Sequence, residues 1–154
     1  MNKRNFTHNS NFVFASNLFE DKEVEYFLQE VNLPGINFNH ITTSVSAVPL
    51  VLQGDTPQYN DLMLSFILDE ELILWKEIFK KLTLMRNPEN SYGDNDEKWG
   101  NLIIQDDNSK EILKLEFHNL RIESVGDLEF NSNSEDEELT LSVTVKYDYF
   151  IILD

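Results

Sequence analysis

The sequence predicts a mainly β domain with one flanking α-helix, on three observations. Apolar and polar residues alternate through several segments of the chain, which is typical of half-buried strands. Over about residues 69–85 the apolar spacing changes to that of an amphipathic helix. The chain has 154 residues, of which 41% are hydrophobic, and this is enough for one domain with a core.

The first part of the chain is predicted to consist of a polar N-terminal arm and extended segments joined by turns. The arm covers residues 1–10, and a short amphipathic helical turn is expected over residues 20–27. Pro34-Gly35 is a strong turn signal, and the stretch Gly54-Asp55-Thr56-Pro57 predicts a second turn. The extended segments are predicted at residues 11–18, 28–33 and 36–52.

The predicted helix directly follows a strand in which Leu62, Leu64, Phe66 and Leu68 alternate with other residues. Asp69 is the predicted N-cap, because a carboxylate there accepts hydrogen bonds from the first turn of a helix. Glu70 and Glu71 then fall in the first turn, Lys80 and Lys81 lie near the end, and Pro88 follows, in agreement with the helix dipole. The apolar stripe that we expect in the core consists of Leu72, Trp75, Ile78, Phe79 and Leu82.

Strands return in the second half of the chain, after a polar loop at residues 87–98. Asp106 to Ser109 forms a turn signal between two extended segments, which predicts a hairpin. An acidic, solvated loop is expected at residues 131–138. The last segment alternates regularly from Leu139 to Tyr149 and predicts one long strand. The remaining strands are expected at residues 101–105, 112–117 and 120–125.

The charge of the chain is strongly negative. Twelve basic and 28 acidic residues give a formal net charge of −16. Such a surface repels phosphate, which argues against a protein that grips nucleic acid. Two explanations stay open: the charge provides solubility, or it lets DNA slide past a surface without binding.

No catalytic, metal-binding or cofactor-binding constellation is found in the sequence, so an enzyme is not predicted. The chain has no cysteine, and His8, His40 and His118 lie too far apart for a metal-ligand spacing. The stretch Asp94 to Trp99 begins like a calcium loop but lacks its later glycine and glutamate. There is no apolar run long enough for a membrane span and no secretory signal, and a reducing compartment is expected.

Three segments, in their order and spacing, resemble the tail tube proteins of contractile-tailed bacteriophages, the tail tube or Hcp-like fold family. Phe12-Val-Phe14, followed by the segment from Phe27 to Gly35, resembles the opening strand pair of this family. Gly54-Asp55, the strand from Tyr59 to Phe66 and the helix that follows resemble the family's order of hairpin, strand and helix. The segment from Val143 to Phe150 resembles the aromatic closing strand of the family. The resemblance spans roughly residues 11–152, so residues 11–154 are predicted to form a single tail-tube-like domain after the arm.

The resemblance implies a small β-barrel or sandwich flanked by one helix. It also implies a structural virion protein: a homo-hexameric ring that stacks on further rings into a tube, through which DNA passes during ejection without specific binding. Tail sheath and baseplate proteins are the implied partners, and the implied location is the virion tail, with synthesis in the host cytoplasm. No cofactor, enzymatic activity or membrane contact is implied.

The residues expected to matter are interface residues. Contacts between rings are expected from the arm, where Lys3 and Arg4 are the only charges, and from the predicted turn formed by Gln53, Gly54, Asp55, Thr56 and Pro57. An untethered terminus and an ordinary turn are the alternative explanations of these two segments. Two other functions also stay open: a tail terminator or baseplate tube initiator of the same fold, and a soluble β-sandwich module that binds a carbohydrate or peptide.

Overall fold

The computed structural model describes residues 11–19, 27–84, 97–133 and 137–153. Most of the predicted helical turn at residues 20–27 and most of the loop at 87–98 therefore lie outside the described residues. The elements in chain order are β1 (Phe12–Ser16), β2 (Leu28–Val31), β3 (Ile36–Val45), β4 (Val48–Tyr59), β5 (Leu62–Ile67), α1 (Ile73–Leu84), β6 (Trp99–Gln105), β7 (Glu111–His118), β8 (Arg121–Val125), β9 (Thr140–Lys146) and β10 (Tyr149–Leu153).

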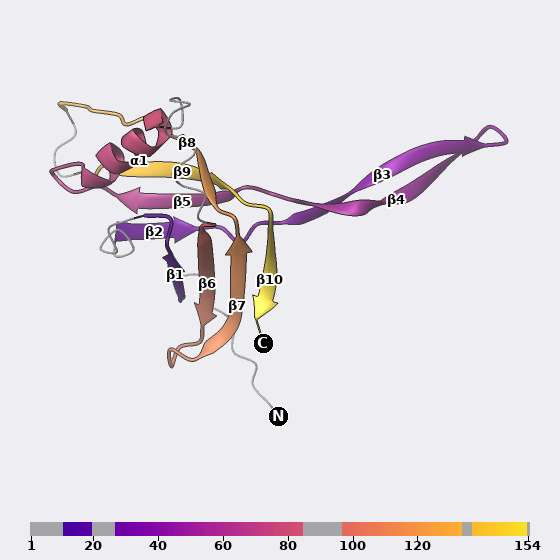
Figure 1. Cartoon of the computed structure of the whole chain (residues 1–154), viewed down its shortest axis with the longest axis horizontal. Coiled ribbons are helices and arrows are strands. Elements are labelled where there is room, and N and C mark those ends of the chain that lie inside the picture. Colours follow the sequence, from indigo (N-terminus) through magenta and orange to yellow (C-terminus); the bar gives the residue numbers. More distant parts are fainter. Residues whose placement is uncertain (1–10, 20–26, 85–96, 134–136, 154) are drawn as a thin grey trace.

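Two antiparallel four-stranded sheets form the body, and the prediction of a mainly β fold with one helix is confirmed. Sheet 1 has the order β1-β6-β7-β10, and sheet 2 has the order β2-β5-β9-β8. The strands of the two sheets run crosswise to one another (Figure 1). Crosswise sheets pack through their inner faces, and the chain passes between them at corners. A third pair, β3 and β4, leaves this body as a long hairpin.

The predicted single strand from Leu139 to Tyr149 is wrong in one respect, because it is two strands in different sheets. Sheet 2 contains β9 and sheet 1 contains β10, and the chain turns between them at Tyr147 and Asp148. The connection from β7 to β8 makes a second corner beside the first, where Asn119 has a positive φ of 59°. The Asn119 side chain donates to the Asp148 carboxylate (2.9 Å), which ties the two corners together.

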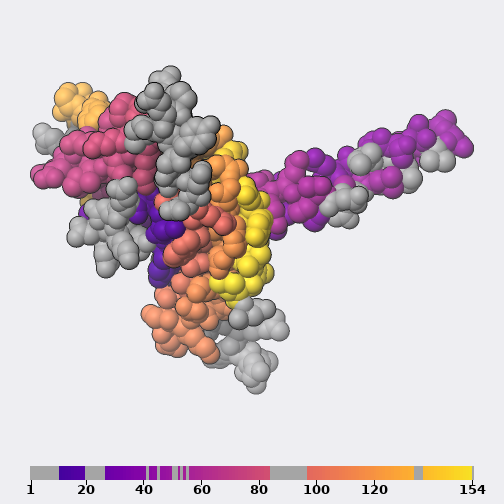
Figure 2. Space-filling model, viewed as in Figure 1, coloured from indigo at the N-terminus to yellow at the C-terminus, as the bar shows by residue number. Residues whose placement is uncertain are grey.

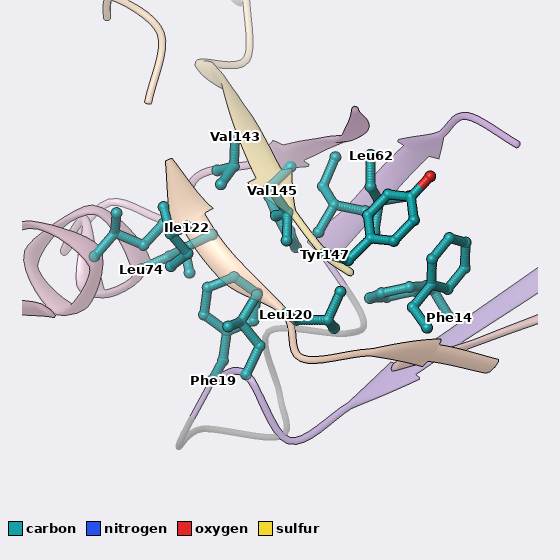
Figure 3. Close-up of a cluster of buried hydrophobic side chains, with 14 of the residues drawn as sticks. Phe14, Phe19, Leu62, Leu74, Leu120, Ile122, Val143, Val145 and Tyr147 are labelled. Carbon is teal, nitrogen blue, oxygen red and sulfur yellow. The ribbon is translucent and has the colours of Figure 1, made fainter. Parts of the chain in front are cut away.

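The core lies between the two sheets and beneath the helix (Figure 3). Alternation in β5 and β9 sends Leu62, Leu64, Val143 and Val145 inward, and all four side chains are buried. Removing this apolar surface from water is the main stabilising term of the fold. The other buried apolar side chains are Phe14, Leu18, Phe19, Phe66, Leu68, Leu74, Ile78, Leu102, Leu115, Phe117, Leu120, Ile122, Leu141 and Tyr147.

The helix begins later than predicted. The backbone N–H of Leu72 donates to the carbonyl of Asp69 (3.2 Å), which closes a turn that still contains Glu70 and Glu71. Leu72 has a positive φ of 54°, and its carbonyl accepts the first helical hydrogen bond from Lys76 (3.0 Å). Leu72 is therefore the N-cap by position. The Asp69 carboxylate still caps the helix from outside it, because it accepts from the Ile73 N–H (3.1 Å).

The buried face of the helix differs from the predicted stripe. Leu74 and Ile78 are buried, while Leu72, Trp75 and Leu82 pack partly buried against the core. The prediction that Phe79 lies in the core is wrong, since its side chain is 52% exposed. Phe79 instead stacks on Trp75 with ring centroids 5.3 Å apart. The predicted stripe rightly included Ile78, but it wrongly included Phe79 and missed Leu74.

The predicted turn at Gly54 to Pro57 is also wrong, because these residues lie within β4. The hairpin reverses at Ser46 and Ala47, whose φ angles are 51° and 66°. Two consecutive residues with positive φ are the signature of a tight hairpin turn that matches the twist of the strands. The signal was hidden in the sequence because this turn lacks the usual asparagine and glycine.

Candidate assembly surfaces

The β3–β4 hairpin projects far beyond the two sheets (Figure 2). It has no third strand among the described residues. Apolar side chains along it are unusually open to solvent: Phe38 is 42% exposed, Leu52 46% and Val48 65%. A two-stranded ribbon is only marginally stable alone in water. An extended ribbon with exposed apolar side chains is a surface built for contact with another chain.

The root of the hairpin is held by the polar groups of Asn60. Its backbone N–H donates to the Gly35 carbonyl (3.0 Å), and its side-chain oxygen accepts from the Asn37 amide (3.1 Å). Its carbonyl accepts from the Tyr147 hydroxyl (2.7 Å). These bonds join the start of β3 and the end of β4 to the corner between the sheets, so the hairpin leaves the body at a fixed place.

An aromatic cluster supports the same root. The Tyr59 ring lies edge-on to Phe150 (centroids 5.2 Å apart) and Tyr147 (6.0 Å), and Phe117 lies edge-on to Tyr147 (5.0 Å). Burial raises the pKa of Tyr147 to about 12, so its phenol remains a hydrogen-bond donor through the neutral range. The aromatic closing segment of the sequence thus anchors the hairpin as well as ending the sheet.

The outer face of sheet 2 is rich in hydroxyl groups, and no described element covers it. Alternation in β5 and β9 turns Ser65, Ser142 and Thr144 away from the core. The register aligns Met63 with Thr144 and Ser65 with Ser142 across these central strands. A face with small polar side chains is suited to contact with water, in contrast to the apolar inner face.

Charged groups at one end of this face are paired. Lys146 Nζ lies 2.6 Å from Asp61 Oδ1 and 3.6 Å from Glu123 Oε2, and the hydrogen bond that Lys146 donates to Asp61 raises the pKa of Lys146. Arg121 Nη1 lies 3.0 Å from Asp148 Oδ1. The hydrogen bond from Asn119, followed by that from Arg121, lowers the pKa of Asp148. At the end of sheet 2, two cations are therefore each paired with at least one of three carboxylates.

Both sheets end in strands that no other described strand pairs with. Sheet 2 ends in β2 and β8, and sheet 1 ends in β1 and β10. Each edge strand of sheet 2 carries one register shift, between Leu28 and Glu30 in β2 and between Ile122 and Ser124 in β8. Unpaired edges present backbone donors and acceptors to a further strand.

The outer face of sheet 1 differs from that of sheet 2, because it exposes large apolar side chains. Val13, Trp99, Tyr149 and Ile151 are all exposed there. The Tyr149 ring stacks on His118 with centroids 4.6 Å apart. This face is suited to contact with protein rather than to lining a water-filled space.

The residues predicted for contacts between rings are distributed as follows. Lys3 and Arg4 lie outside the described residues. Gly54, Thr56 and Pro57 lie in β4, together with positions 53 and 55, in the middle of the hairpin rather than at a turn. Sequence reasoning missed Asn60, whose role depends on three partners that only the fold brings together. The hydroxyl-rich face is visible in part in the sequence, because polar positions alternate with apolar ones through β9.

Two further properties concern only the described residues. Within residues 11–19, 27–84, 97–133 and 137–153, no three histidine or carboxylate side chains gather closely enough to hold a metal ion. In the same ranges, no helix is long and apolar enough to cross a lipid bilayer.

The fold matches solved structures of contractile injection systems. A chain of the anti-feeding prophage tube-terminating cap has a TM-score of 0.70 at 14% identity, with 99% of this chain and 94% of that chain covered. A chain of the sheath/tube terminator of an extracellular contractile injection system also has a TM-score of 0.70 at 14% identity, covering 98% and 99%. Hcp1 from Flavobacterium johnsoniae has a TM-score of 0.51 at 14% identity, covering 92% and 93%. No family model and no curated protein sequence matches the chain.

These likenesses define the class of fold. The chain has an Hcp-like tail tube fold, the fold of tube and terminator components of contractile injection systems, and the predicted resemblance is confirmed at this level. The sequences are at most 14% identical in these comparisons, so the likeness is one of fold.

Proposed function

We propose that this protein is a structural subunit of the inner tube of a contractile tail, with no enzymatic role. The observation that supports this most is sheet 2. It combines a hydroxyl-rich face that no described element covers with two unpaired edges, β2 and β8. A sheet with these properties can join copies of itself side by side and present one polar wall to water.

The strand count supports closure into a ring. Sheet 2 has four strands, and each is antiparallel to its neighbour. Because the number is even, β8 of one copy meets β2 of the next in antiparallel orientation. Every pair of neighbouring strands around the ring is then antiparallel, and a closed ring leaves no strand edge unpaired. We propose six copies per ring, as the family resemblance implies.

Stacking of rings is assigned to the hairpin and the N-terminal arm. The hairpin reaches beyond the body and exposes apolar side chains, and the sequence positions proposed for ring contacts, residues 53–57, lie within it. Lys3 and Arg4 of the arm are proposed to pair with the acidic surface of a neighbouring ring. Head-to-tail contacts of this kind continue without limit, so rings extend into a tube.

The tube is proposed to carry DNA in the virion tail of a contractile phage, without binding it. The net charge of −16 repels phosphate, and the two basic side chains Arg121 and Lys146 near the channel face are paired with carboxylates. Sheath and baseplate proteins are the proposed partners. The solved relatives include chains of a baseplate and of a sheath-tube complex.

A tube terminator or a baseplate initiator is the second candidate. The solved chains with a TM-score of 0.70 come from a tube-terminating cap and from a sheath/tube terminator. A terminator needs the ring but stops the stacking. A purified tube protein should therefore form stacked rings, whereas a purified terminator or initiator should form single rings.

Negative-stain electron microscopy of the purified chain across a concentration series tests the proposal. We expect hollow tubes of stacked rings. Single closed rings at every concentration would favour the terminator or initiator. Strictly monomeric protein would contradict self-assembly and favour the binding module, which a carbohydrate and peptide binding screen would then test.

A further inference from the structure

The outer side of α1 carries positive charge and exposed apolar side chains, although the chain as a whole is acidic. Lys76 and Lys80 are exposed there, and the side chains of Ile73 and Phe79 are 43% and 52% exposed. Spacings of three, four and seven residues place these four side chains on one side of the helix, which we call the helix face. The Phe79 ring is held in the helix face by Trp75, on which it stacks.

The two lysines of the helix face form no salt bridge with any residue that the structure describes. Lys76 and Lys80 are four residues apart, and like charges at this spacing repel one another and destabilise a helix. Glu70 and Glu71 lie in the turn before the helix and do not pair with them either. Carboxylates from another chain would remove this repulsion and would cover the exposed apolar side chains between the lysines.

The connection between β8 and β9, residues 126–139, has the complementary properties, and we call it the acidic segment. It contains six Asp and Glu residues and no Lys or Arg. Its Phe130 side chain is 76% exposed, and Asp127 and Glu129 beside it are exposed as well. Leu128 packs against the core and so anchors this part of the segment to the body. The acidic segment therefore offers what the helix face lacks, which is carboxylates together with an exposed aromatic ring.

The helix face and the acidic segment lie at the same end of the body (Figures 1 and 2). There β5 ends at Ile67, opposite Thr140 at the start of β9, and the Leu68 N–H donates to the Leu139 carbonyl (2.9 Å). The hairpin leaves the body at the other end of β5, before Leu62. Complementary patches at one end of a molecule meet when two copies face each other about a two-fold axis. Head-to-tail stacking joins opposite ends and cannot form this contact.

We propose that two copies of this chain bind one another at this end, with the acidic segment of each copy on the helix face of the other. Phe130 packs on Phe79, and carboxylates of the acidic segment neutralise Lys76 and Lys80. The contact forms twice in each pair, and because it is isologous it closes on itself and does not propagate. Both hairpins point outward from the pair. In a protein that forms tubes, this pairing covers one of the two stacking ends and limits growth.

Cross-linking tests the contact directly, because the chain has no cysteine of its own. Full chains with Thr83→Cys, one turn beyond Phe79, are mixed with full chains of a different mass tag that carry Asn131→Cys, next to Phe130. A short bis-maleimide reagent should then link one copy of each variant. Asn108→Cys, in the exposed turn between β6 and β7, replaces Asn131→Cys in the control mixture, which should give little product.

Charge reversal tests the chemistry of the contact by sedimentation velocity across a concentration series. Lys80→Glu changes the helix face twice in each pair and should weaken pairing about tenfold. Lys110→Glu is the matched control, because it makes the same change in net charge at an exposed position outside the contact, and it should pair like the wild type. Adding Glu129→Lys to Lys80→Glu restores the net charge and the complementarity, so pairing should recover.

The proposal is overturned if Lys110→Glu weakens pairing as much as Lys80→Glu, or if the test mixture gives no more cross-linked product than the control mixture. A chain with both Thr83→Cys and Asn131→Cys should cross-link to a dimer and no further. A ladder of larger species would show a contact between ring neighbours, and a link within one chain would show that the acidic segment covers its own helix; either result overturns the two-fold pair.

The outcomes separate this proposal from the tube function, on which it does not depend. Rings or tubes without the cross-linked dimer uphold the tube and overturn the pair, whereas a cross-linked dimer without rings upholds the pair and contradicts the tube. The melting temperature of each variant checks that the body is folded. Where the melting temperature of Lys80→Glu falls below that of the wild type, Lys80→Gln takes its place.

Discussion

At the scale of single residues, burial decides what each apolar side chain contributes. Ile78 and Phe79 are neighbours on the helix, yet Ile78 is fully buried and Phe79 is mostly exposed. A buried side chain loses both its transfer free energy and its packing contacts when it is truncated. Sequence spacing assigned both residues to the core, and the structure separates them.

This separation predicts unequal losses of stability. Ile78→Ala should lower the free energy of unfolding by about 2–5 kcal/mol, because it opens a cavity under the helix. Phe79→Ala should cost about 0.5–1.5 kcal/mol, since it removes the stacked pair with Trp75 but little buried area. Urea unfolding of the two variants measures the difference, and equal losses would contradict the helix orientation described above.

The hydroxyl of Tyr147 gives a second prediction at this scale. Tyr147→Phe keeps the ring but removes the donor to the Asn60 carbonyl, and it should lower the free energy of unfolding by about 1–2 kcal/mol. The raised pKa of Tyr147 predicts that the stability of the fold depends on pH in the alkaline range. The Tyr147 hydroxyl contributes its full stabilisation of the fold below the ordinary tyrosine pKa of 10.0, and this stabilisation is lost as pH rises through about 12. Denaturation at neutral and alkaline pH checks both statements, and Tyr147→Phe should lack the alkaline loss.

At the scale of elements, the hairpin turn is the clearest strained feature. Ser46 and Ala47 both adopt positive φ angles, which cost about 1–2 kcal/mol per residue when the residue is not glycine. The strands hold the turn in place because they pair along their whole length except at a bulge between Phe38 and His40. The turn is therefore a place where the sequence and the local conformation disagree.

Replacement of Ser46-Ala47 by Asn-Gly should relieve this strain. Asparagine and glycine populate positive φ readily, so the distal hairpin should open less often. We expect slower amide hydrogen exchange in β3 and β4 and an unchanged melting temperature of the body. Gly126→Ala, far from the turn, is the control, and faster exchange in the hairpin of the Asn-Gly variant would contradict the assigned turn geometry.

At the scale of the whole molecule, the net charge of −16 opposes self-assembly. Added salt screens this repulsion, so the critical concentration for tubes should fall as salt rises. Lowering the pH from 7 toward the isoelectric point near 4.4 should act in the same direction. The Arg121–Asp148 pair survives this change, because the pKa of Asp148 lies below its ordinary 3.8 and the contribution is lost only as pH falls through the lowered value.

Light scattering and electron microscopy across salt and pH series measure this dependence. Ordered tubes should appear at lower protein concentration in higher salt. Assembly that weakens with salt would show that attraction between charges, such as those of Lys3 and Arg4 with acidic groups, outweighs the general repulsion.

The sequence by itself determined the mainly β class, the single helix and the family resemblance. These follow from local periodicity, because alternation and helical spacing report which face of each element is buried. It also located the aromatic closing segment, since Tyr147, Tyr149 and Phe150 follow a regular strand.

Only the tertiary structure decided how those elements combine. The last strand divides between two sheets at Tyr147 and Asp148, and the helix begins after Leu72 rather than at Asp69. Gly54 serves a bulge in a long hairpin and not a turn, because a Cβ at this position would lie 2.2 Å from the Asn39 carbonyl oxygen. In each case the local pattern allowed more than one conformation, and the choice was made by contacts between residues far apart in the chain: pairing with a partner strand, packing under the helix, or the approach of the Asn39 carbonyl.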